Sequence, residues 1–170
     1  YYRTYNVEST SLENKIDSIE VPFKVGYTFG GYFAQDVADA YISNVGVISA
    51  ALSSAVSEDT TLYAKWTANQ ITINLENECA TQAGTEAIYY VFNTPAYYDT
   101  ADMDKEAITK IQIPVLAGYT FGGYVADDEL GTVYVDGQGN IINDLYKTVK
   151  EDLSLYAQWT ANTITITLDS

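Results

Sequence analysis

The sequence contains no histidine and a single cysteine, Cys79. The absence of histidine removes Ser-His-Asp and Cys-His catalysis and most zinc sites. One cysteine cannot form a disulfide within the chain, and we interpret Cys79 as a chance residue near the end of a strand. Because no nucleophile–base pair is visible, we expect no enzyme activity, no catalytic residue, no cofactor and no metal site.

Basic residues are also scarce. The chain has 8 Lys and Arg against 23 Asp and Glu, which gives a formal net charge of −15. Residues 1–70 carry 4 basic and 8 acidic side chains and residues 71–170 carry 4 and 15, so the net charges are −4 and −11. Nucleic-acid binding requires clustered Lys and Arg opposite phosphates, which excludes this class of partner and argues against an anionic membrane surface.

Long apolar runs, an initiator methionine and a signal peptide are missing as well. Without an apolar run that could span a bilayer, direct membrane insertion is not expected. Because the chain opens inside a repeat, we expect it to be a fragment of a longer secreted protein. With 47% hydrophobic residues and 16 tyrosines, its composition is that of a globular protein, and the negative charge suits an extracellular module.

What the chain does contain is an internal repeat. The segment Gly-Tyr-Thr-Phe-Gly-Gly-Tyr at 26–32 returns at 118–124, an offset of 92 residues. The segment Leu-Tyr-Ala-Lys-Trp-Thr-Ala-Asn at 62–69 returns at 155–162 with Gln for Lys, an offset of 93 residues. Such a repeat predicts two small domains of roughly 70 to 95 residues.

Apolar residues alternate before and through the first motif of each copy. Odd positions of 19–33 are largely apolar, as are those of 111–125, which predicts extended chain with one buried face. Pro22 and Pro114 cannot donate to a ladder, so the regular strand should begin near the glycine that opens each motif. The paired glycines inside the motif permit a bulge, or the close approach of another segment over the sheet.

A hairpin and a short helix are predicted after each motif. Residues 40–48 and 133–142 are typical of hairpins, the second with an Asp-Gly turn. The period then changes to four, which predicts an amphipathic helix of two to three turns; its apolar positions are Ile48, Leu52 and Val56, and Ile141, Leu145 and Val149.

The apolar period returns to two in the second motif of each copy. In 62–66 the apolar residues are at even positions, and in 71–75 they are at odd positions. One straight strand cannot bury both sets, because neighbouring side chains point to opposite faces. A turn or bulge is therefore expected at 67–69, with Asn69 and Asn162 in the left-handed conformation.

The remaining segments give weaker patterns. Residues 1–8 are expected as a strand and 9–14 as a turn, and residues 86–92 as a strand after a turn at Gly84. Residues 94–100 are expected as a loop, and residues 103–110 as a helical turn capped by Asp102.

The repeat does not show at which residue one domain ends and the next begins, so two phases are possible. In one phase the domains are 1–70 and 71–162, and residues 163–170 either close the second domain as a strand or open a further repeat. In the other phase the domains are 1–75 and 76–170. The terminal strand could also complete the first domain of a neighbouring molecule, because an unfilled sheet edge invites pairing. We favour pairing within the domain, since a hairpin back from Trp159 is the shorter closure.

The two motifs together resemble the Listeria–Bacteroides repeat family, also called the internalin B repeat, in two tandem copies. The resemblance is carried by residues 26–32, 61–66, 118–124 and 154–159, with Tyr where the family usually has Trp at the end of the first motif. The positions that it marks as structural are Gly26, Tyr27, Phe29, Gly31, Tyr32, Leu62, Trp66, Gly118, Tyr119, Phe121, Gly123, Tyr124, Leu155 and Trp159.

This resemblance implies an α+β fold of two tandem small β-grasp-like (ubiquitin-like) domains, mostly strands with one short helix each. It further implies a non-catalytic stalk, spacer or adhesion-associated segment of a bacterial cell-surface protein, located outside the cell, whose partners are neighbouring repeats. The alternative is a module that binds a host or surface protein or a glycan through exposed tyrosines or a free sheet edge.

Two clusters are candidates for ligand contacts. Asp127, Asp128 and Glu129, with Asp136, could supply oxygen ligands to Ca²⁺, although they lack the spacing of a calcium loop and also fit a solvated acidic loop. Tyrosines outside the motifs could stack on sugars or anchor a protein, or pack across strands; they are Tyr1, Tyr2, Tyr89, Tyr90, Tyr97 and Tyr98. The motif aromatics are expected in the core: Tyr27, Phe29, Trp66, Tyr119, Phe121 and Trp159.

Overall fold

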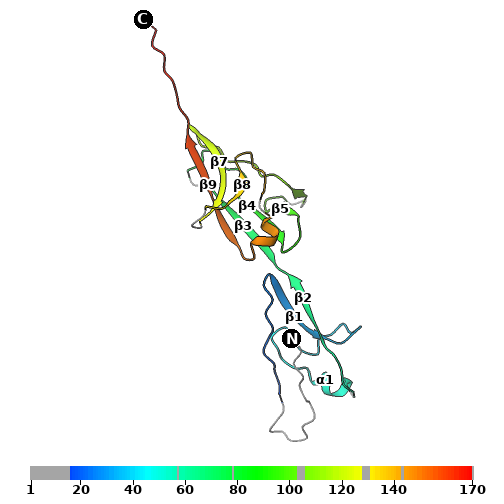
Figure 1. The fold of residues 1–170 in the computed structure, drawn as a ribbon. Helices are drawn as coiled ribbons and strands as arrows, with labels where there is room; N and C mark the ends of the chain where they lie inside the picture. Colours follow the sequence, from blue (N-terminus) through cyan, green and yellow to red (C-terminus); the bar gives the residue numbers. More distant parts are fainter. Residues whose placement is uncertain are drawn as a thin grey trace. The chain divides into compact units, whose positions relative to one another are not determined.

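The computed structural model describes residues 16–56, 58–77, 79–102, 106–127, 131–142 and 144–169. The chain divides into two compact units, Tyr1–Ala68 and Asn69–Ser170, here called unit 1 and unit 2 (Figure 1). Strands predominate in both units, and each unit contains one short helix among its described residues. None of the helices in the described ranges has the length and apolar character needed to cross a membrane.

Unit 1 is built on one pair of antiparallel strands. Strand β1 (Tyr27–Phe33) pairs with β2 (Tyr63–Ala68), and Phe29 lies opposite Trp66. Helix α1 (Ala50–Ala55) lies between them in the sequence, and the side chain of Ser49 caps it by accepting a hydrogen bond from the backbone N–H of Ala51 at 3.2 Å.

Unit 2 contains a seven-stranded sheet in the order β6-β5-β4-β3-β9-β7-β8. Strands β3 and β9 are parallel neighbours in the middle of the sheet, and the other pairs are antiparallel. The elements are β3 (Gln70–Glu76), β4 (Ala87–Val91), β5 (Tyr97–Asp99), β6 (Ala107–Ile108), β7 (Tyr119–Ala126), β8 (Val133–Asp136), α2 (Leu145–Thr148) and β9 (Leu153–Ala161).

Alternating apolar residues of these strands form the core of unit 2. Strand β3 buries every second side chain, as its period of two predicts, and α2 adds Leu145. The side chains with no exposed surface include Ile73, Ile88, Tyr90, Tyr124, Val135, Leu145 and Leu155. Helix α2 is far too short to be stable alone, so it depends on this packing.

The paired glycines of the first motif form a bulge in both units, which confirms the prediction. The register shifts between Phe29 and Gly31 in β1, and between Phe121 and Gly123 in β7. The second glycine has a positive φ, +116° for Gly31 and +119° for Gly123. A Cβ on Gly123 would lie 2.3 Å from the carbonyl oxygen of Val135, so only glycine fits there.

The prediction that the residues before each motif bury one face is wrong for most of these residues. Phe23 is 85% exposed, and Val21, Val25, Ile113 and Val115 are exposed as well, whereas Ile111 is buried. These residues precede the regular strands, where the chain makes isolated bridges and has no continuous sheet to pack on. The strands themselves begin one residue after the glycines, as expected from the prolines.

The predicted hairpins are present, and the predicted helices are shorter than expected. Helix α1 has six residues and α2 has four. Ile48 and Ile141 form bridges with Ile42 and Val135, so both belong to the hairpins rather than to the helices. The apolar spacing of four residues therefore includes extended residues that precede each helix.

The segment between the two copies departs from expectation in two places. Strand β5 occupies part of 94–100, where a loop was predicted, and β6 occupies Ala107–Ile108, where a helical turn was predicted. Residues 103–105 and the strand and turn predicted for 1–8 and 9–14 lie outside the described residues. Strand β4 agrees with the strand expected at 86–92.

The turn or bulge expected at 67–69 lies where the chain passes from unit 1 to unit 2. Strands β2 and β3 lie in different sheets, which explains why their buried faces have opposite parity. Asn69 and Asn162 are not among the positive-φ residues of the described chain, so the left-handed turn predicted there is wrong.

The C-terminal segment does not close unit 2. Residues 163–169 are exposed and belong to no strand, and they leave the end of β9 as an extended trace (Figure 1). Pairing within the domain is therefore wrong, because none of the residues 163–169 takes part in a strand pair. The alternative, that this segment opens a further repeat, stays a prediction.

Candidate functional site

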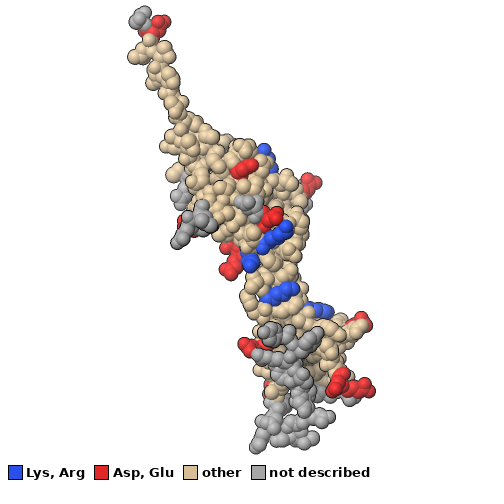
Figure 2. Space-filling model, viewed as in Figure 1, with Lys and Arg blue, Asp and Glu red and all other residues tan. Residues whose placement is uncertain are grey.

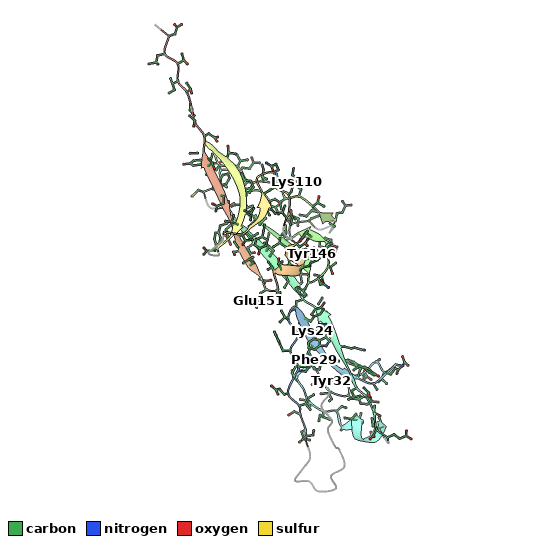
Figure 3. The ribbon with its side chains drawn as sticks, in the orientation of Figure 1. Lys24, Phe29, Tyr32, Lys110, Tyr146 and Glu151 are labelled. Atoms are coloured by element: carbon green, nitrogen blue, oxygen red, sulfur yellow. The ribbon has the colours of Figure 1, made fainter. Side chains whose placement is uncertain are left out.

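The same aromatic arrangement lies at the bulge of each unit. In unit 1 the ring of Phe29 contacts Trp66 at 5.3 Å and Tyr32 at 5.2 Å between centroids (Figure 3). In unit 2 Phe121 contacts Trp159 at 5.5 Å and Tyr124 at 5.2 Å. All four contacts are edge-on or tilted, which aromatic quadrupoles favour.

The structural positions of the motif differ in burial. Phe29, Phe121, Tyr124 and Leu155 are buried. Others are half-buried; they are Tyr27, Tyr32, Leu62, Trp66 and Trp159. Gly26 and Gly118 precede the strands with positive φ. Each indole thus packs partly against its unit, and Trp159 contacts the core.

Tyr119 is the motif aromatic whose predicted core position is wrong. Its side chain is 46% exposed. It is the first residue of β7 and pairs with Ala161 at the last position of β9, so it lies beyond the part of the sheet that the core covers. Its ring instead borders a groove.

The groove lies in the described part of unit 2, between the ends of β3, β7 and β9. It has a volume of about 460 Å³ and is open to solvent. Tyr119 from β7 and Tyr156 from β9 supply exposed rings, and the indole Nε1 of Trp159 is buried without a hydrogen-bond partner. The groove is lined by Glu76, Cys79, Leu116, Tyr119, Tyr156, Ala157 and Trp159. This set offers two exposed aromatic rings with their hydroxyl groups and one carboxylate.

The groove was not expected from the sequence. Its lining combines residues of three strands and two loops, which have no common spacing that could reveal them. Cys79 is exposed and has a positive φ of 69° just past the end of β3, and it is a free thiol.

The tyrosines between the two copies pack across strands. Tyr89 and Tyr98 are opposite one another in β4 and β5, and their rings stack at 5.2 Å. Tyr97 meets Tyr90 at 5.7 Å and Tyr146 at 6.4 Å. Cross-strand packing therefore accounts for these four tyrosines of the cluster, whereas Tyr1 and Tyr2 lie outside the described residues.

Two of the buried tyrosines have perturbed acidity. The hydroxyl of Tyr90 donates to the carbonyl oxygen of Val149 at 2.8 Å, and burial raises its pKa well above the ordinary value. Burial also raises the pKa of Tyr124 to about 12. In both cases the environment disfavours the phenolate because water is excluded from it.

We expect unit 2 to lose stability at high pH for this reason. Below pH 10 these tyrosines are neutral in the folded and unfolded states, so their contribution is fully present. Above pH 10 the unfolded state ionises first, and each tyrosine lowers the free energy of unfolding by about 1.4 kcal/mol per pH unit. Urea unfolding at pH 8 to 12 measures this slope. Tyr124→Phe should reduce it, whereas Tyr63→Phe, at an exposed position, should leave it unchanged.

The acidic cluster proposed as a calcium site is only partly visible. Asp128 and Glu129 lie outside the described residues. The carboxylate of Asp136 accepts hydrogen bonds from the backbone of Gln138 and from the backbone and side chain of Asn140, which lower its pKa. It closes the turn after β8. Within the ranges that the structure covers, no three His, Cys, Asp or Glu side chains converge as metal ligands do.

Comparison with known proteins finds one matching family and two relatives that are similar in sequence. The family described as Listeria-Bacteroides repeat domain matches residues 3–65 and 93–158. Two proteins of Evansella cellulosilytica are also similar. One, named "Putative membrane protein", is 29% identical over 149 residues, which cover 87% of this chain and 18% of that protein. The other, named "Putative Gly-rich membrane protein", is 27% identical over 150 residues, which cover 88% and 14%.

The chain thus spans less than a fifth of the length of these two relatives. No solved structure matches it. The two segments that match the family cover well over half of the chain, and each contains one copy of the bulged motif and at least half of the strand that pairs with it. The chain therefore belongs to the Listeria-Bacteroides repeat family.

Proposed function

We propose that this chain is a non-catalytic segment of two tandem repeats, of the kind also called internalin B repeats, that acts as a stalk or spacer in an adhesion-associated protein on the bacterial surface. The observation that carries the proposal is the recurrence of one bulged strand pair, β1–β2 and β7–β9, in two compact units. It is supported by relatives named as membrane proteins, in which a segment of this size is a small part.

The order of strands in unit 2 supports the β-grasp-like part of the proposal. The long strand that opens the unit, β3, and the strand that ends it, β9, are parallel neighbours at the centre. Each has an antiparallel neighbour on its other side, β4 and β7, and a short helix precedes the last strand. Neighbouring repeats of the same chain are the partners that this reading implies.

A stalk must resist tension, and the topology of unit 2 suits that role. The chain enters on β3 and leaves on β9, with Ile73 opposite Leu153 and Leu75 opposite Leu155. Tension between the start of β3 and the end of β9 pulls two parallel strands past each other, so their hydrogen bonds and side-chain contacts must fail together. An antiparallel hairpin pulled at adjacent ends instead opens one pair at a time.

Single-molecule force spectroscopy tests this. We expect unit 2 to rupture at a clearly higher force when handles are attached at 69 and 162 than when they are attached at 69 and 93. The second geometry unzips β3 from β4, because the N–H of Phe92 donates to the carbonyl of Asn69 at 2.9 Å. A Cys79→Ser background keeps the native thiol out of the coupling chemistry. Equal rupture forces in the two geometries would remove the mechanical basis of the stalk.

The groove of unit 2 favours a second candidate function, a module that binds a glycan or a surface protein. The exposed rings of Tyr119 and Tyr156 are the features that favour it. A glycan array and calorimetry distinguish the two functions. Tyr156→Ala should abolish binding, whereas Tyr63→Ala, the matching exposed tyrosine of unit 1, should not.

A further inference from the structure

The two units differ in the turn that leads into the bulged strand. In unit 1 the backbone N–H of Tyr27 donates to the carbonyl oxygen of Lys24 at 3.1 Å. In unit 2 the backbone N–H of Tyr119 donates to the carbonyl oxygen of Leu116, also at 3.1 Å. Lys24 and Leu116 are 92 residues apart, which is the offset of the first motif. The same turn therefore carries an ammonium group in unit 1 and an apolar side chain in unit 2.

The lysine of this turn covers two aromatic rings in unit 1. The Nζ atom of Lys24 lies 3.9 Å from the centroid of the Tyr27 ring and 5.9 Å from the centroid of the Trp66 ring (Figure 3). At both distances the negative face of an aromatic ring attracts a cation. Unit 1 therefore supplies a cation to these two rings from its own chain.

The matching rings of unit 2 have no cation of their own. Tyr119 and Trp159 are the counterparts of Tyr27 and Trp66, at the offsets of the two motifs, 92 and 93 residues. Among the residues that the structure describes, no Lys or Arg lies over Tyr119 or Trp159. Tyr119 is 46% exposed, whereas Tyr27 is half-buried. The aromatic pair of unit 2 is therefore accessible to a cation from outside the chain.

Both rings line the groove of unit 2, and the groove adds a carboxylate. Glu76 and Tyr156 are paired residues of β3 and β9 and line the same groove. The Oε1 atom of Glu76 accepts a hydrogen bond from the hydroxyl of Ser154 at 3.2 Å, which restrains the carboxylate. The lining residues that the structure describes include no Lys or Arg, so a cation in the groove meets no like charge there.

The charge of the surrounding surface also favours a positive ligand. Residues 71–170 contain 4 basic and 15 acidic side chains, which gives a net charge of −11. Figure 2 shows acidic side chains scattered over unit 2. The resulting negative potential raises the local concentration of cations and speeds their encounter with the groove, whereas a neutral sugar gains nothing from it.

We propose that the groove of unit 2 binds the ammonium group of a lysine side chain on a partner protein, over the rings of Tyr119 and Trp159. This ammonium takes the place that Lys24 has in unit 1, and Glu76 offers it a carboxylate. Leu116 offers apolar surface to the aliphatic stem of the lysine. The assignment rests on the second candidate function, since it names the chemistry of the surface protein that the groove binds.

Indole NMR signals of the full chain test this, because each unit contains one tryptophan, and Trp66→Phe identifies the signal of Trp159. The probe is Nα-acetyl-lysine methylamide, and its control is the Nε-acetylated analogue, which has the same stem without the charge. We expect the lysine probe to shift the Trp159 signal saturably at millimolar concentration and the Trp66 signal little, because Lys24 already covers that ring. The acetylated analogue should bind at least about fivefold more weakly. Glu76→Gln should weaken binding of the lysine probe several-fold.

Leu116→Lys tests the position of the ammonium directly. It gives unit 2 the residue that unit 1 has, so an internal ammonium covers both rings and should weaken the lysine probe by at least about fivefold. Val115→Lys adds the same charge at the adjacent exposed position, outside the lining of the groove, and should change the affinity by less than about twofold. The reciprocal variant Lys24→Leu should make the Trp66 signal respond to the probe. Unchanged thermal unfolding shows that the variants remain folded.

Three results would overturn the assignment of a lysine. Equal affinities for the lysine probe and its acetylated analogue remove the ammonium preference, although the groove then still binds a ligand. A shift with methyl β-glucoside and none with the lysine probe assigns the groove to a glycan instead. Full affinity in the Leu116→Lys chain shows that the probe binds elsewhere. The second candidate function is decided separately by the glycan array, and the stalk is decided by the rupture forces.

Discussion

Gly123→Ala is expected to destabilise unit 2 by at least about 3 kcal/mol, close to the largest effects of single substitutions. Two costs add. The residue has a φ of +119°, where a side chain is strained by about 1 to 3 kcal/mol, and its Cβ would lie 2.3 Å from the carbonyl oxygen of Val135. Because that oxygen belongs to the backbone of β8, the clash cannot be relieved by rotating a side chain and must separate β7 from β8.

Two other glycines separate these costs. Gly122→Ala places a Cβ at ordinary contact distance, 3.4 Å from Gln158, and should change stability by less than about 1 kcal/mol. Gly118 has a φ of +81° with nothing within 4 Å, so Gly118→Ala measures the backbone strain alone. Urea unfolding followed by fluorescence in a Trp66→Phe background, where Trp159 is the remaining indole, reports on unit 2. An equal loss for all three variants would contradict the role of the bulge.

The parts of this fold that sequence reasoning identified are those with a strong local cause. The paired glycines predicted the bulges because no other residue tolerates that backbone, and the Asp-Gly turn predicted the hairpin that Asp136 closes. Cross-strand packing of Tyr89 on Tyr98 was one of two alternatives for these tyrosines, because residues 94–100 were predicted as a loop.

The predictions that were wrong concern burial and strand pairing, which depend on residues far away in the sequence. Val21 and Val25 alternate as strand residues do, but no layer covers them, so they remain exposed. Strand β5 was missed because its pairing is decided by β4 and not by its own sequence. The groove escaped notice because Glu76, Leu116 and Tyr156 come together only through the sheet order. Burial is a property of the assembled unit, and a local pattern predicts only that a residue is suited to it.

The Ile-Thr-Ile sequence occurs twice in this chain, once inside a sheet and once exposed. The two copies therefore distinguish the effect of local sequence from the effect of neighbouring strands. Ile73 is fully buried in β3 between β4 and β9, and its counterpart Ile166 is 79% exposed, although the local sequence is nearly the same. Ile73→Ala should lower the free energy of unfolding of unit 2 by about 3 to 4 kcal/mol, since it leaves a cavity at the centre of a sheet that cannot collapse from either side.

Ile166→Ala is the matched control and should change the free energy of unfolding by less than about 0.5 kcal/mol, because its side chain is 79% exposed. Both variants are measured by urea unfolding in the Trp66→Phe background. If Ile166→Ala costs as much as Ile73→Ala, the segment 163–168 must be packed in solution and not exposed. A large effect of Ile73→Ala with none of Ile166→Ala assigns the stabilisation to the neighbours of β3 and not to its sequence.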